Sequence, residues 1–449
     1  MLDIKYIRDN ADSLKKAIAA KQLNPKIVDE VLRVDEERRQ LIGAVEELRQ
    51  QINEHAAKLK GGKPSDEDID IGRKLKAKLQ DVEPQLNKIE EMFFDFMYRI
   101  PNPAFSDVPV GRDESENVVV KQVGEPTKFD FVPKDHLEIG RDLDIIDTET
   151  ATTITGSRFG YLKGGAALLE FALIQYVMSI LTNTEKIKQI VDSVKPGYHA
   201  RPFVPVVPPV MIRPDIFKRM ARLSEADKDE RYYLPQDDLY LIGSAEHTLG
   251  PMYVDKTLPE KSLPLRYIGF STSFRREAGS YGKDTKGILR VHQFDKLEME
   301  SFTLPEDSRT EQDFLIAVQE YLVSGLKIPY QLISICTGDM GKPDARQMDI
   351  NCWLPGQNKF RETHTSDLMT DYQARRLNTK VRRKDGSTEY LHMNDATAIA
   401  IGRMIIAIIE NYQQADGTVK VPDVLVPFMG KEVIGFAPPK PEAKGGRAD

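Results

Sequence analysis

The sequence predicts an α+β protein in which an antiparallel coiled-coil helical hairpin precedes one larger α+β domain. Two observations support this prediction. Apolar residues of the first quarter recur at alternating spacings of four and three, which is typical of paired helices. Beyond the Pro-Asn-Pro sequence at 101–103, the pattern changes to short alternating segments separated by turns, such as 117–120. We therefore expect a hairpin domain at 1–110, a second domain at 111–435, and a disordered tail at 436–449.

The heptad pattern occupies two successive stretches. The first places the following residues at a and d positions: Ile27, Val31, Val34, Arg38, Leu41, Val45, Leu48, Ile52, His55 and Leu59. The second stretch does so for Leu75, Leu79, Val82, Leu86, Ile89, Phe93, Phe96 and Ile100. Residues 61–66, Gly-Gly-Lys-Pro-Ser-Asp, form a turn by composition, so the helices should fold back on each other. Pro84 should kink or locally break the second helix. By spacing alone, such hairpins are more often dimerisation or scaffold elements.

Composition limits the classes of function. The chain has 449 residues and a formal net charge of −7, so any binding of nucleic acid must use local basic patches. No apolar run looks long enough to span a bilayer, since the best candidate, 166–181, contains Glu170. The start of the chain lacks a signal-peptide pattern. The two cysteines, Cys336 and Cys352, have no metal-ligand spacing. We expect a cytoplasmic protein without a membrane partner.

Three segments of the second domain carry charged residues at positions that strands and helices would give to apolar ones. They are 274–277 together with 289–299 beyond a polar loop, then 360–365, and finally 399–406. Arg275 and Glu277 should share one face of a strand, and Arg403 should lie near the start of an apolar helix. A buried arginine is costly unless it meets an anion, so the set suits a ligand that carries phosphates. For any one of these residues, a structural ion pair is the commoner explanation.

Taken in order, these segments resemble motifs 2 and 3 of class II aminoacyl-tRNA synthetases, and Pro209 lies where motif 1 has its proline. Further segments are similar to bacterial-type seryl-tRNA synthetases. They are 107–111 (DVPVG), 155–159 (TGSRF), 278–282 (AGSYG), 292–296 (HQFDK), 336–341 (CTGDMG), 373–376 (QARR) and 410–417 (ENYQQADG). The resemblance extends from the first residue to Gly430. It implies that 111–435 is a catalytic domain built on an antiparallel sheet flanked by helices.

The resemblance implies that the chain activates L-serine with ATP and Mg²⁺, and then transfers it to tRNA(Ser), with tRNA(Sec) as a further candidate. Such chemistry needs positioning and charge neutralisation rather than an enzyme nucleophile. The residues expected to carry catalysis are Arg275 on the α-phosphate and serine carboxylate, Arg403 on the γ-phosphate, and Glu362, which with Thr365 would hold Mg²⁺. The expected ATP site comprises Arg275, Arg276, Glu277, Val291, Phe294, Glu362, Thr363, His364, Thr365 and Arg403. In it, Glu277 would accept from the adenine amino group and Phe294 would stack on the ring.

The same resemblance assigns the serine site. Ser244, Ala245 and Glu246 occupy the place of a Thr-Ala-Glu sequence, and Glu246 should bind the ammonium. Glu298 should accept from the serine hydroxyl with Thr397 as its second partner, while Arg275 holds the carboxylate. The chain departs from the family pattern nearby. Residues 363–368 (THTSDL) replace a Ser-rich stretch that ends in Ser-Asn, and 395–398 (DATA) replace Asn-Gly-Ser-Gly.

In such synthetases the hairpin grips the long variable arm of the serine tRNA, and motif 1 forms a homodimer interface. The expected tRNA contacts cluster near the predicted turn and are Lys58, Lys60, Lys63, Arg73, Lys74, Lys76 and Lys78. Two other functions are alternatives to that of a seryl-tRNA synthetase. An amino acid:carrier-protein ligase of class II type would lack the long arm. A non-catalytic coiled-coil RNA-binding protein would be expected to lose Arg275, Glu277, Glu298 or Arg403, and all four are present.

Overall fold

A computed structural model describes residues 1–60, 62, 64–224, 227–278 and 286–436. The chain divides into two compact units, and the boundary falls between Ala104 and Phe105. The predicted tail lies outside the described residues except for Phe436.

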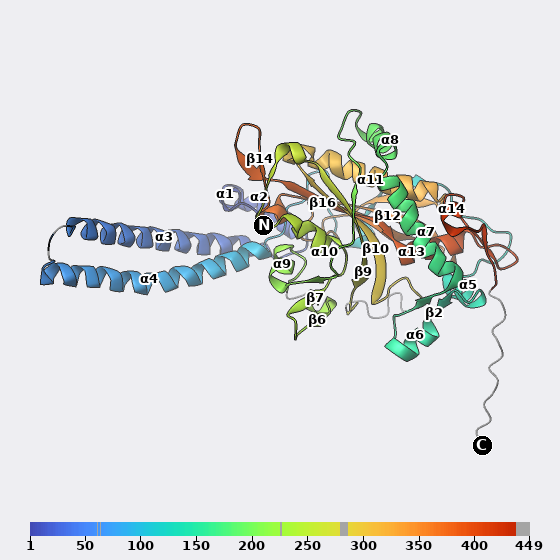
Figure 1. Cartoon of the computed structure of the whole chain (residues 1–449), viewed down its shortest axis with the longest axis horizontal. Coiled ribbons are helices and arrows are strands. Elements are labelled where there is room, and N and C mark those ends of the chain that lie inside the picture. The colour runs from blue at the N-terminus through green and yellow to red at the C-terminus, as the bar shows by residue number, and fades with distance from the viewer. Residues whose placement is uncertain (61, 63, 225–226, 279–285, 437–449) are drawn as a thin grey trace, which may run out of the picture. The chain divides into compact units, whose positions relative to one another are not determined.

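The first unit is entirely helical (Figure 1). Its helices are α1 (Ile4–Asp9), α2 (Ala11–Ala20), α3 (Ile27–Lys58) and α4 (Asp66–Arg99). The side chain of Ser65 accepts from the backbone N–H of Asp68, and the carboxylate of Asp68 accepts from that of Ser65. This capping box begins α4 directly after the turn. Since α3 and α4 have 32 and 34 residues, each spans roughly 50 Å.

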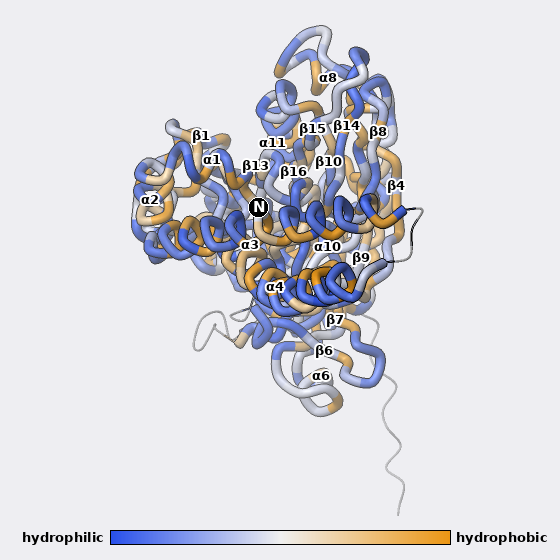
Figure 2. Tube along the Cα trace, turned by 90° about the vertical axis from the view of Figure 1, so that its left-hand side faces the viewer, coloured by the Kyte–Doolittle hydropathy of each residue, from blue (hydrophilic) through white to orange (hydrophobic). Residues whose placement is uncertain are grey.

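The predicted seam holds α3 and α4 together. Val31 and Val34 on α3 and Phe93 on α4 are buried, and orange and blue alternate along both helices in Figure 2. Arg38 occupies a seam position because its guanidinium lies 4.6 Å from the centre of the Phe93 ring. The predicted local break at Pro84 is wrong, since α4 continues through it. The proline is exposed and removes a single backbone donor, which the surrounding seam contacts outweigh.

An eight-stranded sheet forms the centre of the second unit, in the order β1-β11-β12-β13-β16-β10-β9-β4. Neighbouring strands are antiparallel except β4 and β9, which are parallel. The strands are β1 (Val118–Val123), β4 (Val204–Val206), β9 (Leu265–Phe274), β10 (Gln293–Thr303), β11 (Tyr330–Ser334), β12 (Arg346–Leu354), β13 (Lys359–Thr370) and β16 (His392–Ala400).

The two faces of this sheet differ in chemistry because side chains alternate along each strand. On β10, Leu297 and Met299 join the apolar core, together with residues of α7 (Gly164–Leu181), α11 (Ser308–Gly325) and α13 (Ile401–Asn411). Lys296, Glu298 and Glu300 alternate with these residues along β10 and lie on the opposite face. One face therefore holds the fold together, and the other carries buried charge.

Smaller elements surround the sheet. The helices are α5 (His136–Asp142), α6 (Thr148–Thr155), α8 (Thr184–Val194), α9 (Pro214–Arg219), α10 (Glu246–Leu249), α12 (Tyr372–Leu377) and α14 (Val426–Met429). The strands are β2 (Ile146–Asp147), β3 (Tyr161–Leu162), β5 (Met211–Ile212), β6 (Tyr233–Leu234), β7 (Leu239–Leu241), β8 (Thr257–Pro259), β14 (Lys380–Arg382), β15 (Thr388–Tyr390), β17 (Val419–Lys420) and β18 (Val433–Ile434). The predicted fold class, a helical hairpin followed by an antiparallel sheet with helices, is confirmed.

The helix α7 is, by length and composition, apolar enough to cross a membrane, so the sequence-based exclusion on length is wrong. Half of its apolar window is buried inside the fold, where Leu169, Leu173 and Val177 join the core. Buried core helices of globular proteins also meet these criteria of length and apolar composition. Its one carboxyl, Glu170, lies near Asp295, and burial raises the pKa of Glu170 to about 8.

Candidate active site

One pocket of the second unit gathers most of the residues predicted to bind ATP. It is lined by Arg275, Glu277, Ile288, Leu289, Arg290, Val291, Phe294, Lys296, Glu362, Thr363, Thr397, Ala400, Gly402 and Arg403. These residues lie on β10, β13 and β16, at the start of α13, and on the segments next to β9 and β10. The three charged segments of the sequence, which are far apart along the chain, therefore meet at one place.

The first charged segment differs from its prediction. β9 ends at Phe274, so Arg275 and Glu277 follow the strand rather than share its face, and Glu277 has a positive φ of 54°. Both side chains nevertheless line the pocket. Arg275 donates from Nε to the carbonyl of Gly243 at 3.1 Å, and its guanidinium lies 5.2 Å from the centre of the Phe294 ring. Glu277 accepts from Arg290 at 2.6 Å.

Arg276 is not among the residues that line this pocket. It is exposed, and its guanidinium lies 5.8 Å from the centre of the Tyr232 ring.

Arg403 and Glu362 form an ion pair across the pocket. The Nη1 of Arg403 donates to the carboxylate of Glu362 at 2.9 Å and to its backbone carbonyl at 2.8 Å. The side chain of Glu362 is exposed, and the charges of Arg403 and then Arg275 lower its pKa. The glutamate therefore stays ionised between two arginines.

A β-bulge brings Glu362 and Thr365 to the same face of β13. Ile350 pairs with His364 and Asn351 with Glu362, which leaves Thr363 as the extra residue. Asp349, on β12, accepts from the hydroxyl of Thr365 at 2.9 Å. Burial and then the charge of Glu362 hold the pKa of Asp349 well above its ordinary value. Oxygen ligands of this kind suit Mg²⁺, which usually takes only one or two carboxylates from a protein and the rest from phosphates and water. Within the described ranges, no group of three or more His, Cys, Asp and Glu residues could hold a metal by itself.

Thr363 and His364 are both buried in the sheet. Thr363 donates to the carbonyl of Ile350 at 3.1 Å, and its hydroxyl is 2.8 Å from the Nδ1 of His364. Burial lowers the pKa of His364 to about 3, so the ring is neutral at pH 7. His364 does not line the pocket, unlike Thr363.

The predicted serine residues meet around a buried carboxylate. Glu298 pairs with Lys296 at 2.5 Å, and its Oε2 also accepts from Thr397 at 3.2 Å and from Ser244 at 3.4 Å. A second bulge, at Ala398, places Thr397 opposite Glu298. Burial raises the pKa of Glu298 to about 8, although Lys296 opposes the shift. A hydroxyl or ammonium donor beside it would favour the ionised form.

Glu246 lies at the start of α10 and is buried beside this cluster. Its Oε2 has no hydrogen-bond partner within the described part of the chain. Burial would raise the pKa of Glu246, but Lys296 and other cationic neighbours outweigh it and hold the pKa well below its ordinary value. The preceding Ala245 belongs instead to an apolar cluster with Leu249, so only its backbone could face a ligand.

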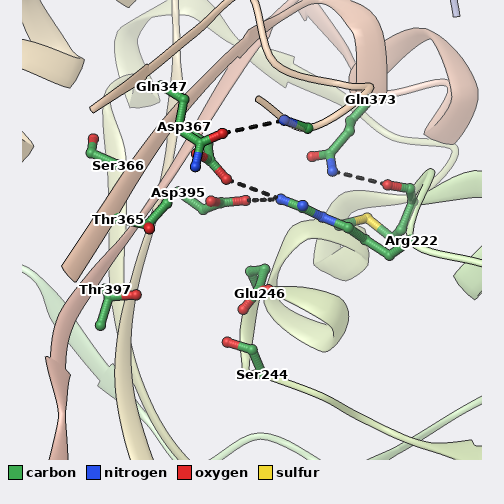
Figure 3. A network of polar contacts seen from close by, with 12 residues as sticks. Arg222, Ser244, Glu246, Gln347, Thr365, Ser366, Asp367, Gln373, Asp395 and Thr397 are labelled. Atoms are coloured by element: carbon green, nitrogen blue, oxygen red, sulfur yellow. Dashed lines mark hydrogen bonds and ion pairs between the residues drawn. The ribbon is translucent and has the colours of Figure 1, made fainter. Parts of the chain in front are cut away.

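Figure 3 shows a network that the sequence did not reveal. The guanidinium of Arg222, which follows α9, pairs with Asp395 at 3.0 Å and with Asp367 at 3.5 Å. Burial raises the pKa of Asp395 to about 7, although Arg222 opposes the shift. Lys296 and Asp349 were also missed. Lys296 could have been found, because it lies two residues before Glu298 on the same strand.

The basic residues near the turn of the hairpin are exposed. They are Lys58, Lys60, Arg73, Lys74, Lys76 and Lys78, whereas Lys63 lies outside the described residues. Acidic side chains accompany them, since Asp66, Glu67 and Asp68 form the first turn of α4 and Asp70 pairs with Lys74 at 2.7 Å. The turn is therefore a mixed surface with basic side chains available to a partner.

Two parts of the chain match known families. Residues 231–412 match the tRNA synthetase class II core domain (G, H, P, S and T), and residues 1–104 match the seryl-tRNA synthetase N-terminal domain. The fold and the site thus define a class II aminoacyl-tRNA synthetase.

Relatives that match over nearly the whole chain identify the family more specifically. The chain is 37% identical over 440 residues to the serine–tRNA ligase of Treponema denticola, covering 97% of this chain and 100% of the relative. It is 38% identical over 436 residues to the serine–tRNA ligase of Dictyoglomus turgidum, covering 96% of this chain and 98% of the relative. The crystal structure of seryl-tRNA synthetase from Pyrococcus horikoshii complexed with ATP is similar to this structure with a TM-score of 0.88 and 36% sequence identity. The match covers 98% of this chain and 100% of that chain. The chain belongs to the seryl-tRNA synthetase family.

Proposed function

We propose that this chain activates L-serine with ATP to form seryl-adenylate and pyrophosphate, and then transfers serine to the 3′ end of tRNA(Ser). The family supplies the overall reaction, serine–tRNA ligation. The observation that carries the residue assignment is the meeting of Arg275, Arg403 and Glu362 around one pocket that also reaches Thr397. Serine-dependent ATP–pyrophosphate exchange, followed by aminoacylation of tRNA(Ser), tests the two steps. Aminoacylation of tRNA(Sec) tests the second tRNA.

In this proposal the arginines position phosphates. Arg275 holds the α-phosphate and the serine carboxylate, and Arg403 holds the γ-phosphate. Guanidinium suits both tasks because it donates two parallel hydrogen bonds to an anion. Glu277 accepts from the adenine amino group beside Phe294, and Arg290 holds the Glu277 carboxylate in place.

Mg²⁺ would be held by Glu362 and Thr365, with Asp349 behind the threonine hydroxyl. When bound, the ion neutralises phosphate charge. Because Arg403 pairs with Glu362, it would exchange part of this carboxylate contact for phosphate when ATP binds.

The serine site would use the buried cluster. The unpartnered oxygen of Glu246, within the part of the chain that the structure describes, is available to the ammonium, and Ser244 lies close to it in sequence. Glu298 accepts from the serine hydroxyl, with Thr397 as the second partner. A site built to pair a hydroxyl rejects alanine because its own polar groups would then stay unpaired.

Glu298→Ala should lose discrimination as well as activity. Loss of the acceptor should cost about 1–3 kcal/mol and should fall on serine rather than alanine. Exchange assays with serine and alanine measure the ratio of their kcat/KM values. Glu298→Gln keeps the shape and one acceptor oxygen, so it should retain part of the preference. A Glu298→Ala enzyme with the wild-type ratio would contradict the assignment.

Thr397→Ser should be nearly neutral, whereas Thr397→Val should raise the KM for serine. The hydroxyl of Thr397 donates to Glu298 and accepts from Lys296, and only serine preserves those contacts. Steady-state exchange kinetics at varied serine provide the comparison. An equal response to both substitutions would indicate packing rather than hydrogen bonding.

The hairpin would bind the variable arm of the tRNA through the exposed basic residues near its turn, with phosphates as their partners. The enzyme would act as a cytoplasmic homodimer. Exposed apolar side chains on α7 and β4 support the dimer, among them Leu168, Phe171 and Val204. Both cysteines are free and buried, which suits a reducing compartment.

A further inference from the structure

Two buried carboxyls, Asp367 on β13 and Asp395 on β16, meet in space. β13 and β16 are neighbours, and their register places Asp367 directly opposite Asp395. The register of β16 with β10 places Glu300 opposite Asp395 on the other side. Three carboxyls thus form one row across three adjacent strands.

This row is buried and poorly balanced. Glu300, Asp395 and Asp367 are at most 6% exposed, and both side-chain oxygens of Glu300 have no hydrogen-bond partner within the described ranges. Like charges directly opposite each other destabilise a sheet, and buried charge is costly unless it is paired. Glu246 and Asp344 add further negative charge nearby, and Lys296 offsets less of it at Asp395 than Arg222 does.

Arg222 supplies the main compensating cation. It reaches the row from the segment after α9, where the positive φ of Ala221 turns the chain away from the helix. Its guanidinium lies 3.0 Å from Asp395 and 3.5 Å from Asp367, and it points between them in Figure 3. One arginine therefore pairs with both carboxyls, on strands whose residues are far from it in the sequence.

The row lies one step along the strands from the serine residues. Asp395 precedes Thr397 by two positions on β16, and Glu300 follows Glu298 by two on β10, so all four share one face. A shift of either strand to relieve unpaired charge in the row would move the Glu298–Thr397 pair as well.

We propose that Arg222 is a positioning residue for the serine site, and that it acts through its pairing with Asp367 and Asp395. This inference rests on the proposed function. Arg222 does not need to touch serine, ATP or the reacting atoms. It holds Thr397 and Glu298 in register by balancing the charge behind them.

The test is a mutant cycle of the full-length chain: wild type, Arg222→Met, Asp367→Ser/Asp395→Asn, and the triple variant. Arg222→Met should raise the KM for serine by about tenfold or more, since it leaves buried carboxyls without their cation, while the KM for ATP should change by less than about twofold. The triple variant should recover most of the loss, because it removes the two carboxyls that Arg222→Met leaves without their cation.

The result that would overturn the proposal is an additive cycle, in which the triple variant is no better than Arg222→Met, or a rise of both Michaelis constants together. If Arg222→Met does not accumulate as folded protein, Arg222→Lys takes its place in the cycle, with a smaller rise expected and the same recovery required. Absence of serine exchange in the wild type would instead contradict the proposed function, so the two failures are distinguishable.

Discussion

Arg275→Lys and Arg403→Lys should each reduce serine-dependent ATP–pyrophosphate exchange by about a hundredfold or more, although both keep the charge. An ammonium is a point charge that cannot make the forked contact of a guanidinium with phosphate or carboxylate. Arg403 already binds an anionic partner in this structure, since one of its nitrogens reaches both the carboxylate and the backbone carbonyl of Glu362. Exchange rates at saturating ATP and serine measure the effect.

Arg276→Lys is the matched control. It changes the neighbouring arginine, which is exposed and does not line the pocket, so its exchange rate should stay near that of the wild type. Thermal unfolding of all three variants checks that they are folded. If the Arg275→Lys or Arg403→Lys protein is folded and keeps near wild-type exchange, the phosphate role of that arginine is wrong.

Removal of the first unit, residues 1–104, should leave serine activation largely intact and abolish charging of tRNA(Ser). The seam between α3 and α4 closes on itself, and every residue that lines the pocket comes from the second unit. Because α1 and α2 pack on α3, the deletion should take the whole unit rather than 27–100 alone. Pyrophosphate exchange and aminoacylation on the same protein measure the two steps.

A milder variant neutralises Lys58, Lys60, Lys74 and Lys78 together. For each lost phosphate contact, the slope of log tRNA affinity against log salt concentration should become shallower by about one unit. The control neutralises four exposed lysines of the same unit away from the turn, namely Lys5, Lys16, Lys26 and Lys88. Loss of both activities in the deletion would indicate that the unit supports the catalytic domain structurally. Survival of both would mean that another surface binds the tRNA.

The parts of this molecule that follow a simple period were predictable from the sequence. The heptads predicted the α3–α4 pair. The resemblance added residue roles that periodicity could not supply. Most of the residues it named for ATP do line one pocket.

What could not be predicted depends on local backbone geometry or on long-range contacts. β9 ends at Phe274, before Arg275 and Glu277, and the bulges at Thr363 and Ala398 reset which side chains share a face. Arg222 gave no signal, because its partner Asp395 is 173 residues away and only the folded sheet brings them together.

The most direct test of the central claim is ATP–pyrophosphate exchange with the purified chain, screened over all twenty amino acids. The account predicts exchange with serine, rejection of alanine for lack of a hydroxyl, and exclusion of threonine by its extra methyl group. Exchange that depends equally on another amino acid, or no exchange with serine at all, would contradict it.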